Sequence, residues 1–200
     1  MDAQKAPATA GSRRLNLGCG RFPKPGYVNV DVDDRGAQDI THDLNRFPYP
    51  FADGAFDLVE SSHSLEHLAD PFAVMAEIHR LLAPGGKAVI KVPHFSRGLT
   101  HPDHKRGFDV SFPYYFDPDF PGGYSGTPFE LVSLRLRWNG QPYLKKQVFS
   151  WPIHTGLAAV GVVVDLFANL SPALCSRIWC FWVGGFEEIE FAFRKPGAGG

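Results

Sequence analysis

The chain has 200 residues, of which 44% are apolar and 20% charged, and its formal net charge is −1. This apolar share is enough for a hydrophobic core, so global disorder is excluded. The near-neutral net charge predicts no large basic surface for binding nucleic acid, and we expect no nucleic-acid partner. Cys19, Cys175 and Cys180 are too scattered for a disulfide framework or a zinc site. They favour a reducing, cytoplasmic location.

Small residues and proline dominate both ends of the chain. Residues 1–13 lack the apolar segment of a secretion signal, so we predict a disordered lead-in there. Residues 196–200 are predicted to form a short tail, and residues 14–195 a single domain.

Strands and one clear helix are predicted in the first half of this domain. Alternating or β-branched segments predict strands over residues 14–17, 27–32, 40–43, 56–60 and 87–92. A helix is predicted to begin at Pro71, because Asp70 is a good N-cap and apolar residues recur at helical spacing up to Leu82. We expect Pro84-Gly-Gly86 to end it. This strand–helix–strand order predicts parallel pairing with a right-handed crossover.

The second half opens with a long irregular segment. Residues 94–129 are rich in proline, glycine, histidine and aromatic residues, which predicts a lid-like functional loop. Residues 130–137 and 187–194 alternate and predict strands, the last of them antiparallel. Residues 156–183 predict two apolar helices divided at Ser171-Pro172, which we expect to cover one face of the sheet.

A glycine-rich turn follows the first predicted strand, in the segment Leu15-Asn-Leu-Gly-Cys-Gly20. Glycines there let the backbone approach a ligand closely. Asp31 ends the next strand, where a carboxylate can accept hydrogen bonds from ribose hydroxyls. Pro23 stands where a dinucleotide-binding motif needs its third glycine, and it has no N–H for a phosphate. A pyrophosphate at a helix N-terminus is therefore disfavoured.

Four segments in order resemble the class I, Rossmann-like S-adenosylmethionine (SAM)-dependent methyltransferases, in particular the small type with a Leu-Gly-Cys-Gly motif. They are Leu17–Gly20, Asp31, the run from His42 to Asp57, and the stretch from Ser64 to Gly86. The resemblance covers about residues 14–93. It implies SAM as cofactor and a three-layer α/β sandwich, with a mostly parallel seven-strand-type sheet and an antiparallel last strand. The short stretches after Gly20 and Asp33 leave no room for full helices, so the first crossovers are abbreviated.

The resemblance also implies a set of cofactor-binding residues. Leu17, Gly18, Cys19 and Gly20 correspond to the loop that holds the methionine part of SAM. Asp31 corresponds to the residue that binds ribose, and Asp43 with Leu44 to the adenine contact. Val32 and Ser62 complete the predicted set.

Candidate catalytic residues are His63 and His94, because each follows a strand at the carboxyl edge, where open α/β sheets bind ligands. Either could accept a proton near neutral pH. His67 fits a structural role better. His101, His104, Tyr114 and Tyr115 are candidate substrate contacts on the loop. Metal binding by His101, Asp103 and His104 is the less favoured alternative, so we expect no metal.

The predicted function is SAM-dependent methylation of a small molecule at oxygen or nitrogen. One alternative is a SAM-binding protein with non-methylating chemistry, and another is a nicotinamide-dependent oxidoreductase. The apolar residues 156–183 open a further possibility, a homodimer or a peripheral membrane contact.

Overall fold

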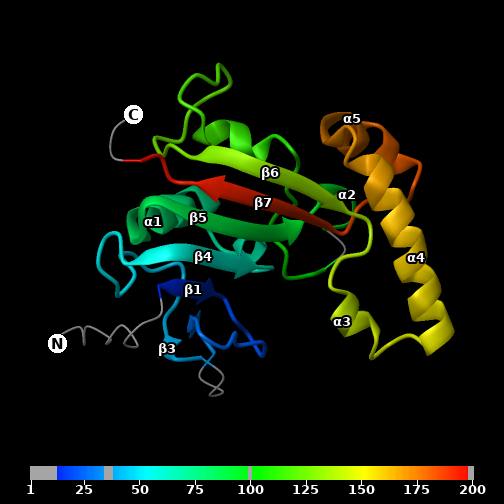
Figure 1. Ribbon diagram of the computed structural model, residues 1–200, viewed down its shortest axis with the longest axis horizontal. Helices are drawn as coiled ribbons and strands as arrows, with labels where there is room; N and C mark the ends of the chain where they lie inside the picture. Colours follow the sequence, from blue (N-terminus) through cyan, green and yellow to red (C-terminus); the bar gives the residue numbers. More distant parts are fainter. Residues whose placement is uncertain (1–12, 34–37, 99–100, 198–200) are drawn as a thin grey trace.

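The structure, a computed structural model, describes residues 13–33, 38–98 and 101–197. Its centre is a seven-stranded sheet in the order β3-β2-β1-β4-β5-β7-β6 (Figure 1). The strands are β1 (Arg14–Leu17), β2 (Val28–Asp31), β3 (Ile40–Thr41), β4 (Phe56–Ser62), β5 (Leu82–Pro93), β6 (Glu130–Arg137) and β7 (Glu188–Arg194). The first five pair in parallel, and β7 runs antiparallel to both its neighbours. The predicted mostly parallel sheet with an antiparallel last strand is confirmed.

Helix α1 (Pro71–Leu81) forms as predicted, because the Asp70 side chain accepts hydrogen bonds from the backbone N–H groups of Phe72 and Ala73. The predicted end of the helix is wrong. Leu82 is already extended and pairs with Phe56, so β5 begins there. Pro84-Gly-Gly86 lies within β5, where the register with β4 shifts between Leu82 and Lys87.

The two faces of the sheet differ in polarity. The face toward α1 carries apolar side chains such as Leu15, Val59 and Ile90, all fully buried. The opposite face carries Asn16, Asn29 and Glu60, which lie side by side in the strand register.

The predicted third layer is incomplete over β1 and β4, because the abbreviated crossovers provide no long helix there. The loop after β1 takes its place, and Lys24 Nζ lies 2.9 Å from the Glu60 carboxylate.

Residues 94–129 are not simply a lid. Within them lie helix α2 (Phe95–Gly98) and 3₁₀ helix η2 (Phe112–Phe116). The rings of Phe116 and Phe129 pack at 5.5 and 5.4 Å from that of Phe193 in β7. Because these rings are buried, the second half of the segment is a wall of the hydrophobic core rather than a movable cover.

The apolar segment forms α4 (Trp151–Ala168), α5 (Pro172–Arg177) and η3 (Trp179–Phe181), with the division at Ser171-Pro172 as predicted. Its expected place over a sheet face is wrong. Only Gly161 and Ala168 of α4 are buried, and the helix stands at one end of the sheet (Figure 1). By length and composition alone, α4 could cross a membrane.

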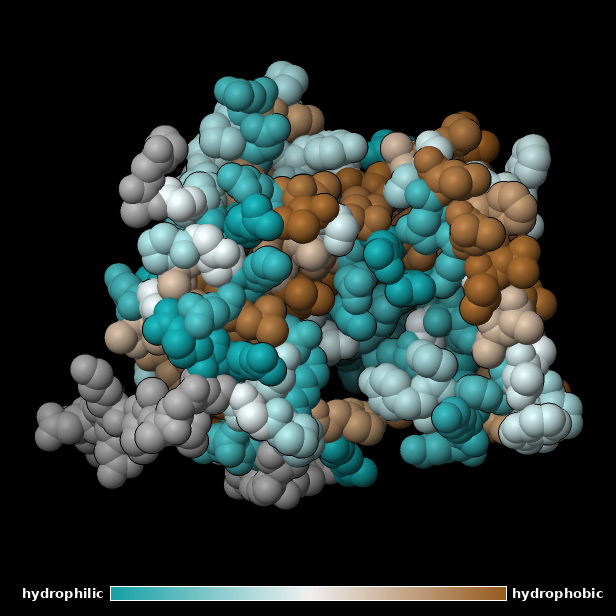
Figure 2. Space-filling view, viewed as in Figure 1, coloured by the Kyte–Doolittle hydropathy of each residue, from teal (hydrophilic) through white to brown (hydrophobic). Residues whose placement is uncertain are grey.

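The polarity of α4 is reversed from that of an ordinary surface helix. Its one acidic residue, Asp165, faces inward and accepts a hydrogen bond from the Trp138 backbone N–H at 2.7 Å. Asn169, just past the helix, pairs with the backbone of Leu136. The outward side chains are apolar, and hydrophobic residues gather over α4 and α5 (Figure 2).

The described part of the chain is anchored at both ends. Arg13, which we assigned to the lead-in, makes two hydrogen bonds to the Asp57 carboxylate. Lys195 donates from Nζ to the carbonyl oxygens of His79 and Leu82. The rest of the predicted lead-in, and residues 198–200 of the predicted tail, lie outside the described residues.

Candidate functional site

The first candidate site is a cavity of about 380 Å³ at the carboxyl ends of β1, β2 and β4. We call it the glycine-loop cavity. It brings together most of the predicted cofactor residues, and its lining is Gly18, Gly20, Asp31, Val32, Asp43, Leu44, Asn45, His63, Ser64, His67 and Leu68. The volume lies within the ~300–1,000 Å³ range of small-molecule sites.

The glycine loop is fixed by close packing and by Asp31. A Cβ atom on Gly18 would lie 2.0 Å from Ser64 Oγ, so only glycine fits there. The backbone N–H of Gly20 donates to Asp31 Oδ2 at 2.7 Å, and that of Asp33 donates to Oδ1 at 3.0 Å. The carboxylate is thereby oriented at the cavity wall, with lone pairs left for a ligand's hydroxyl groups.

Three predicted cofactor residues do not line this cavity. Leu17 and Cys19 are buried in the core, and burial raises the pKa of the Cys19 thiol to about 11. The Ser62 carbonyl accepts a hydrogen bond from Ser64 Oγ. A side-chain contact from any of the three to a ligand in the cavity is therefore not what the structure shows.

Hydrogen bonds within the chain hold Asp43 and Leu44 at one corner of the cavity. The Asp43 carboxylate accepts hydrogen bonds from the backbone and side chain of Asn45, which lower its pKa. Leu44 is buried, and its carbonyl oxygen accepts a hydrogen bond from the hydroxyl of Tyr49. An apolar side chain thus lies beside a fixed carboxylate.

A second cavity, of about 400 Å³, shares His63 and His67 with the first. We call it the histidine cavity. It is lined by His63, Glu66, His67, Pro93, Arg97, Gly98, His101, His104, Gly140, Gln141, Leu144, Lys145 and Glu187. The predicted contacts His101 and His104 therefore lie beside the glycine-loop cavity.

His63 lies between the two cavities but is not a base at neutral pH. Its Nε2 is 2.8 Å from Glu188 Oε2, and its Nδ1 is 3.4 Å from Glu66 Oε1. Burial lowers the pKa of His63, but the interactions with Glu188 and Glu66 outweigh it and raise the pKa to about 9. The ring is therefore protonated at neutral pH, which contradicts the predicted role.

His94 is also misassigned as a catalytic residue. It is fully buried, with Nδ1 2.7 Å from Ser96 Oγ and Nε2 2.8 Å from Ser176 Oγ. Burial lowers the pKa of His94 to about 4. It lines neither cavity, and its role is to join β5 to α5.

Tyr114 and Tyr115 lie away from both cavities. Tyr114 packs against Phe120 at a ring distance of 5.5 Å, and Tyr115 packs against Phe72 at 5.6 Å. Tyr115 instead lines a separate cavity of about 530 Å³ with Phe108 and Phe112, and Tyr114 lines another of about 500 Å³. Their predicted contact with substrate stays a prediction.

Sequence reasoning missed Glu66 and Glu188 as site residues. Glu66 was visible within the Leu65-Glu-His-Leu68 motif, but its complete burial was not. Glu188 gave no signal, because it stands 125 positions after His63 and reaches it only through the pairing of β7 with β5.

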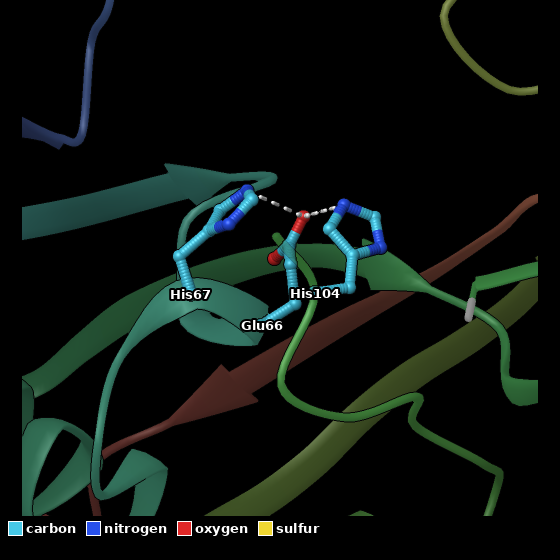
Figure 3. Close-up of side chains that lie close together, drawn as sticks. All are labelled: Glu66, His67 and His104. Carbon is cyan, nitrogen blue, oxygen red and sulfur yellow. Dashed lines mark ion pairs between the residues drawn. The ribbon is translucent and has the colours of Figure 1, made fainter. Parts of the chain in front are cut away.

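Figure 3 shows a compact cluster of Glu66 and His67 from η1 (Leu65–His67) with His104 from the loop after α2. Their candidate ligand atoms all lie within 4.8 Å of one another. The trio of His101, Asp103 and His104, which was the less favoured alternative from the sequence, is not the group that comes together in this way.

Comparison with known proteins gives matches among methyltransferases. A family described as "Methyltransferase domain" matches residues 27–90. A demethylmenaquinone methyltransferase from Thermus thermophilus is 34% identical over 132 residues, which cover 64% of this chain and 52% of that protein.

Solved structures share the fold. A SAM-dependent methyltransferase from Mesorhizobium loti aligns with a TM-score of 0.55 and 16% identity, over 92% of this chain and 91% of that one. The [4+2]-cyclase SpnF aligns with a TM-score of 0.51 and 17% identity, over 94% of this chain and 76% of that one.

The chain has the fold of the class I, Rossmann-like SAM-dependent methyltransferases, and it is similar in sequence to proteins of that class. Within that class, the matching family is the one described as a methyltransferase domain. The matched segments span between 20% and 52% of the length of the curated relatives.

Proposed function

We propose that this protein transfers a methyl group from SAM to a small molecule, at oxygen or nitrogen. The observation that carries the proposal is the pair of adjoining cavities that share His63 and His67. One has the lining expected for a nucleoside-type donor, and the other offers a separate space beside it for an acceptor.

The residues of the glycine-loop cavity fit SAM. Asp31 is held with its carboxylate at the wall, where it would accept hydrogen bonds from ribose hydroxyls. Val32 and Leu44 provide apolar surface for the adenine ring, and the Gly18–Gly20 loop leaves backbone groups accessible to the methionine part. Bound SAM would supply an electrophilic methyl group on a positively charged sulfur.

The protein's own contribution is mainly orientation. With His63 protonated and His94 buried, neither predicted histidine acts as a general base at neutral pH. A neutral amine needs no base, and alignment of acceptor and donor in adjoining sites can contribute roughly 7–11 kcal/mol in favourable cases. The polar lining of the histidine cavity would hold and orient the acceptor.

Titration calorimetry with SAM, S-adenosylhomocysteine and NADH tests the cofactor. The proposal is supported if SAM and S-adenosylhomocysteine bind and NADH does not. It is refuted if NADH binds and SAM does not. Product masses on a panel of amines and hydroxyl compounds test the reaction. SpnF is a cyclase with this fold, so SAM binding without any methylated product would favour the non-methylating alternative.

The possible homodimer or peripheral membrane contact through residues 156–183 stays a proposal. It is supported by the outward apolar side chains of α4 and of the segment after it, among them Val162 at 70% and Trp182 at 81% exposure. The cytoplasmic location likewise stays a proposal, supported by three buried free cysteines.

A further inference from the structure

The carboxylate of Glu66 is in an unusual environment. Its side chain is fully buried, and among the described residues neither of its oxygens has a hydrogen-bond partner. Burying a carboxylate without compensation is costly, since such a group normally pairs with a cation or binds a metal. The nearest side-chain nitrogen given for it is Nδ1 of His63, 3.4 Å from Oε1, and the His63 ring makes a shorter contact to Glu188 through Nε2.

Two further imidazoles point at the same carboxylate oxygen (Figure 3). Nε2 of His67 lies 3.9 Å from Glu66 Oε1, and Nε2 of His104 lies 3.8 Å from it. These distances are too long for hydrogen bonds. They leave space for an ion between the three side chains.

The Nδ1 atoms of His67 and His104 each make a hydrogen bond to a backbone carbonyl oxygen. His67 Nδ1 pairs with the carbonyl oxygen of Asp103 at 3.1 Å, and His104 Nδ1 pairs with that of Gly98. A carbonyl oxygen only accepts, so each Nδ1 carries the hydrogen, and in the neutral ring Nε2 presents its lone pair to the carboxylate. This second contact is the one that metal-binding histidines typically make.

The backbone holds the cluster together. The N–H of Lys105 donates to the carbonyl oxygen of Glu66 at 2.9 Å, which ties the loop carrying His104 to η1. One carboxylate and two imidazoles are the protein ligands of a common type of catalytic zinc site, with metal–ligand distances of about 2.0–2.2 Å. Two ligand atoms at these distances from one tetrahedral ion lie about 3.3–3.6 Å apart. The 3.8 and 3.9 Å separations from Glu66 Oε1 therefore need to close by only a few tenths of an ångström, and the two imidazole nitrogens lie within 4.8 Å of each other.

We propose that Glu66, His67 and His104 bind a divalent transition-metal ion of the zinc type, with an open coordination position facing the histidine cavity. His104 and His67 both line that cavity, so the open position would take water or an oxygen atom of the acceptor. This role for the open position rests on the proposed function, whereas metal binding itself does not. The ligand set, with two imidazoles, discriminates against Mg²⁺, which prefers oxygen ligands.

The test is metal binding by untagged, chelator-treated protein. Zn²⁺ and Mg²⁺ are titrated by calorimetry, and Co²⁺ binding is followed by its visible absorption. We expect one Zn²⁺ or Co²⁺ per chain and no Mg²⁺ binding. Glu66→Gln and His104→Ala should each weaken Zn²⁺ binding by more than about 10–100-fold, the loss typical of removing only a supporting contact. His154→Gln, at a half-buried position of α4 that lines neither cavity, is the matched histidine control and should bind as the wild type does.

Absence of Zn²⁺ and Co²⁺ binding in the wild type, or binding that survives both substitutions, would overturn the proposal. Circular dichroism checks the fold of each variant. His104→Ala changes a loop residue, so it keeps the test valid if Glu66→Gln does not fold. SAM binding without metal binding would refute this inference alone, and metal binding without SAM binding would refute the proposed function alone.

Discussion

Gly18 and Gly20 provide a matched pair for testing how the glycine loop is packed. Both have positive φ, +69° and +51°. A Cβ on Gly18 would lie 2.0 Å from Ser64 Oγ and 2.7 Å from its Cβ, whereas a Cβ on Gly20 would meet no atom within 4 Å. Alanine at either position therefore adopts a strained backbone, but only at Gly18 does it also collide with a side chain.

The two substitutions should differ in stability by the cost of that collision. The left-handed backbone costs alanine about 1–2 kcal/mol. Reduced freedom of the unfolded chain returns about 0.4–1 kcal/mol. These terms are common to both sites. Overpacking adds about 1–3 kcal/mol at Gly18 alone, so Gly18→Ala should unfold about 2–12 °C below Gly20→Ala in a protein of this size.

Urea denaturation and thermal melts of the two variants measure this difference. In a Ser64→Gly background the collision is removed, so Gly18→Ala should cost less there than in the wild type. Equal losses for Gly18→Ala and Gly20→Ala, or no effect of the Ser64 background, would refute the packing argument.

Three further predictions concern Asp31, His94 and the outward face of α4. Asp31→Ala should weaken SAM binding by about 1–3 kcal/mol in calorimetry, the scale of a lost hydrogen bond to a charged group; unchanged affinity would show that Asp31 does not contact the ribose. The folded-state pKa of His94, about 4, lies below its ordinary 6.5, so its contribution to stability is complete above pH 6.5 and disappears as the pH falls toward 4. Urea titrations should therefore show a loss of up to about 3 kcal/mol over this range that is absent in His94→Gln, and an identical pH dependence in the variant would contradict it. Val162→Lys with Leu166→Lys should abolish any liposome co-sedimentation or dimer seen for the wild type, and persistence of either would show that it does not use α4.

Local signals in the sequence predicted those parts of the fold that short-range contacts determine. Asp70 and Pro71 marked the start of α1, and the alternation in residues 187–194 marked the last strand. The end of α1 was misplaced, because Leu82 continues the helical spacing of apolar residues but its backbone pairs with Phe56 in the sheet. Tertiary pairing there outweighs periodicity.

The candidate site likewise has residues that local sequence predicts and residues whose behaviour depends on distant parts of the chain. Asp31, Asp43 and the two glycines were predictable as cavity residues, because each lies at or just past the end of a strand or belongs to a contiguous motif. The protonation of His63 and the burial of His94 were not predictable, because they depend on Glu188 and Ser176, which are distant in sequence. Position at the sheet edge identified both histidines as candidates, but protonation and burial decide what each can do.

The attachment of α4 has a consequence for how it would respond to a partner. The helix is held to β6 and the loop after it by Asp165 and Asn169, through hydrogen bonds for which water competes. An apolar partner on the outward face would exclude that water and lower the local dielectric, which strengthens such bonds. A partner bound to the outward face should therefore strengthen the inward hydrogen bonds of Asp165 and Asn169. The helix would be held most firmly to the sheet when its exposed face is covered.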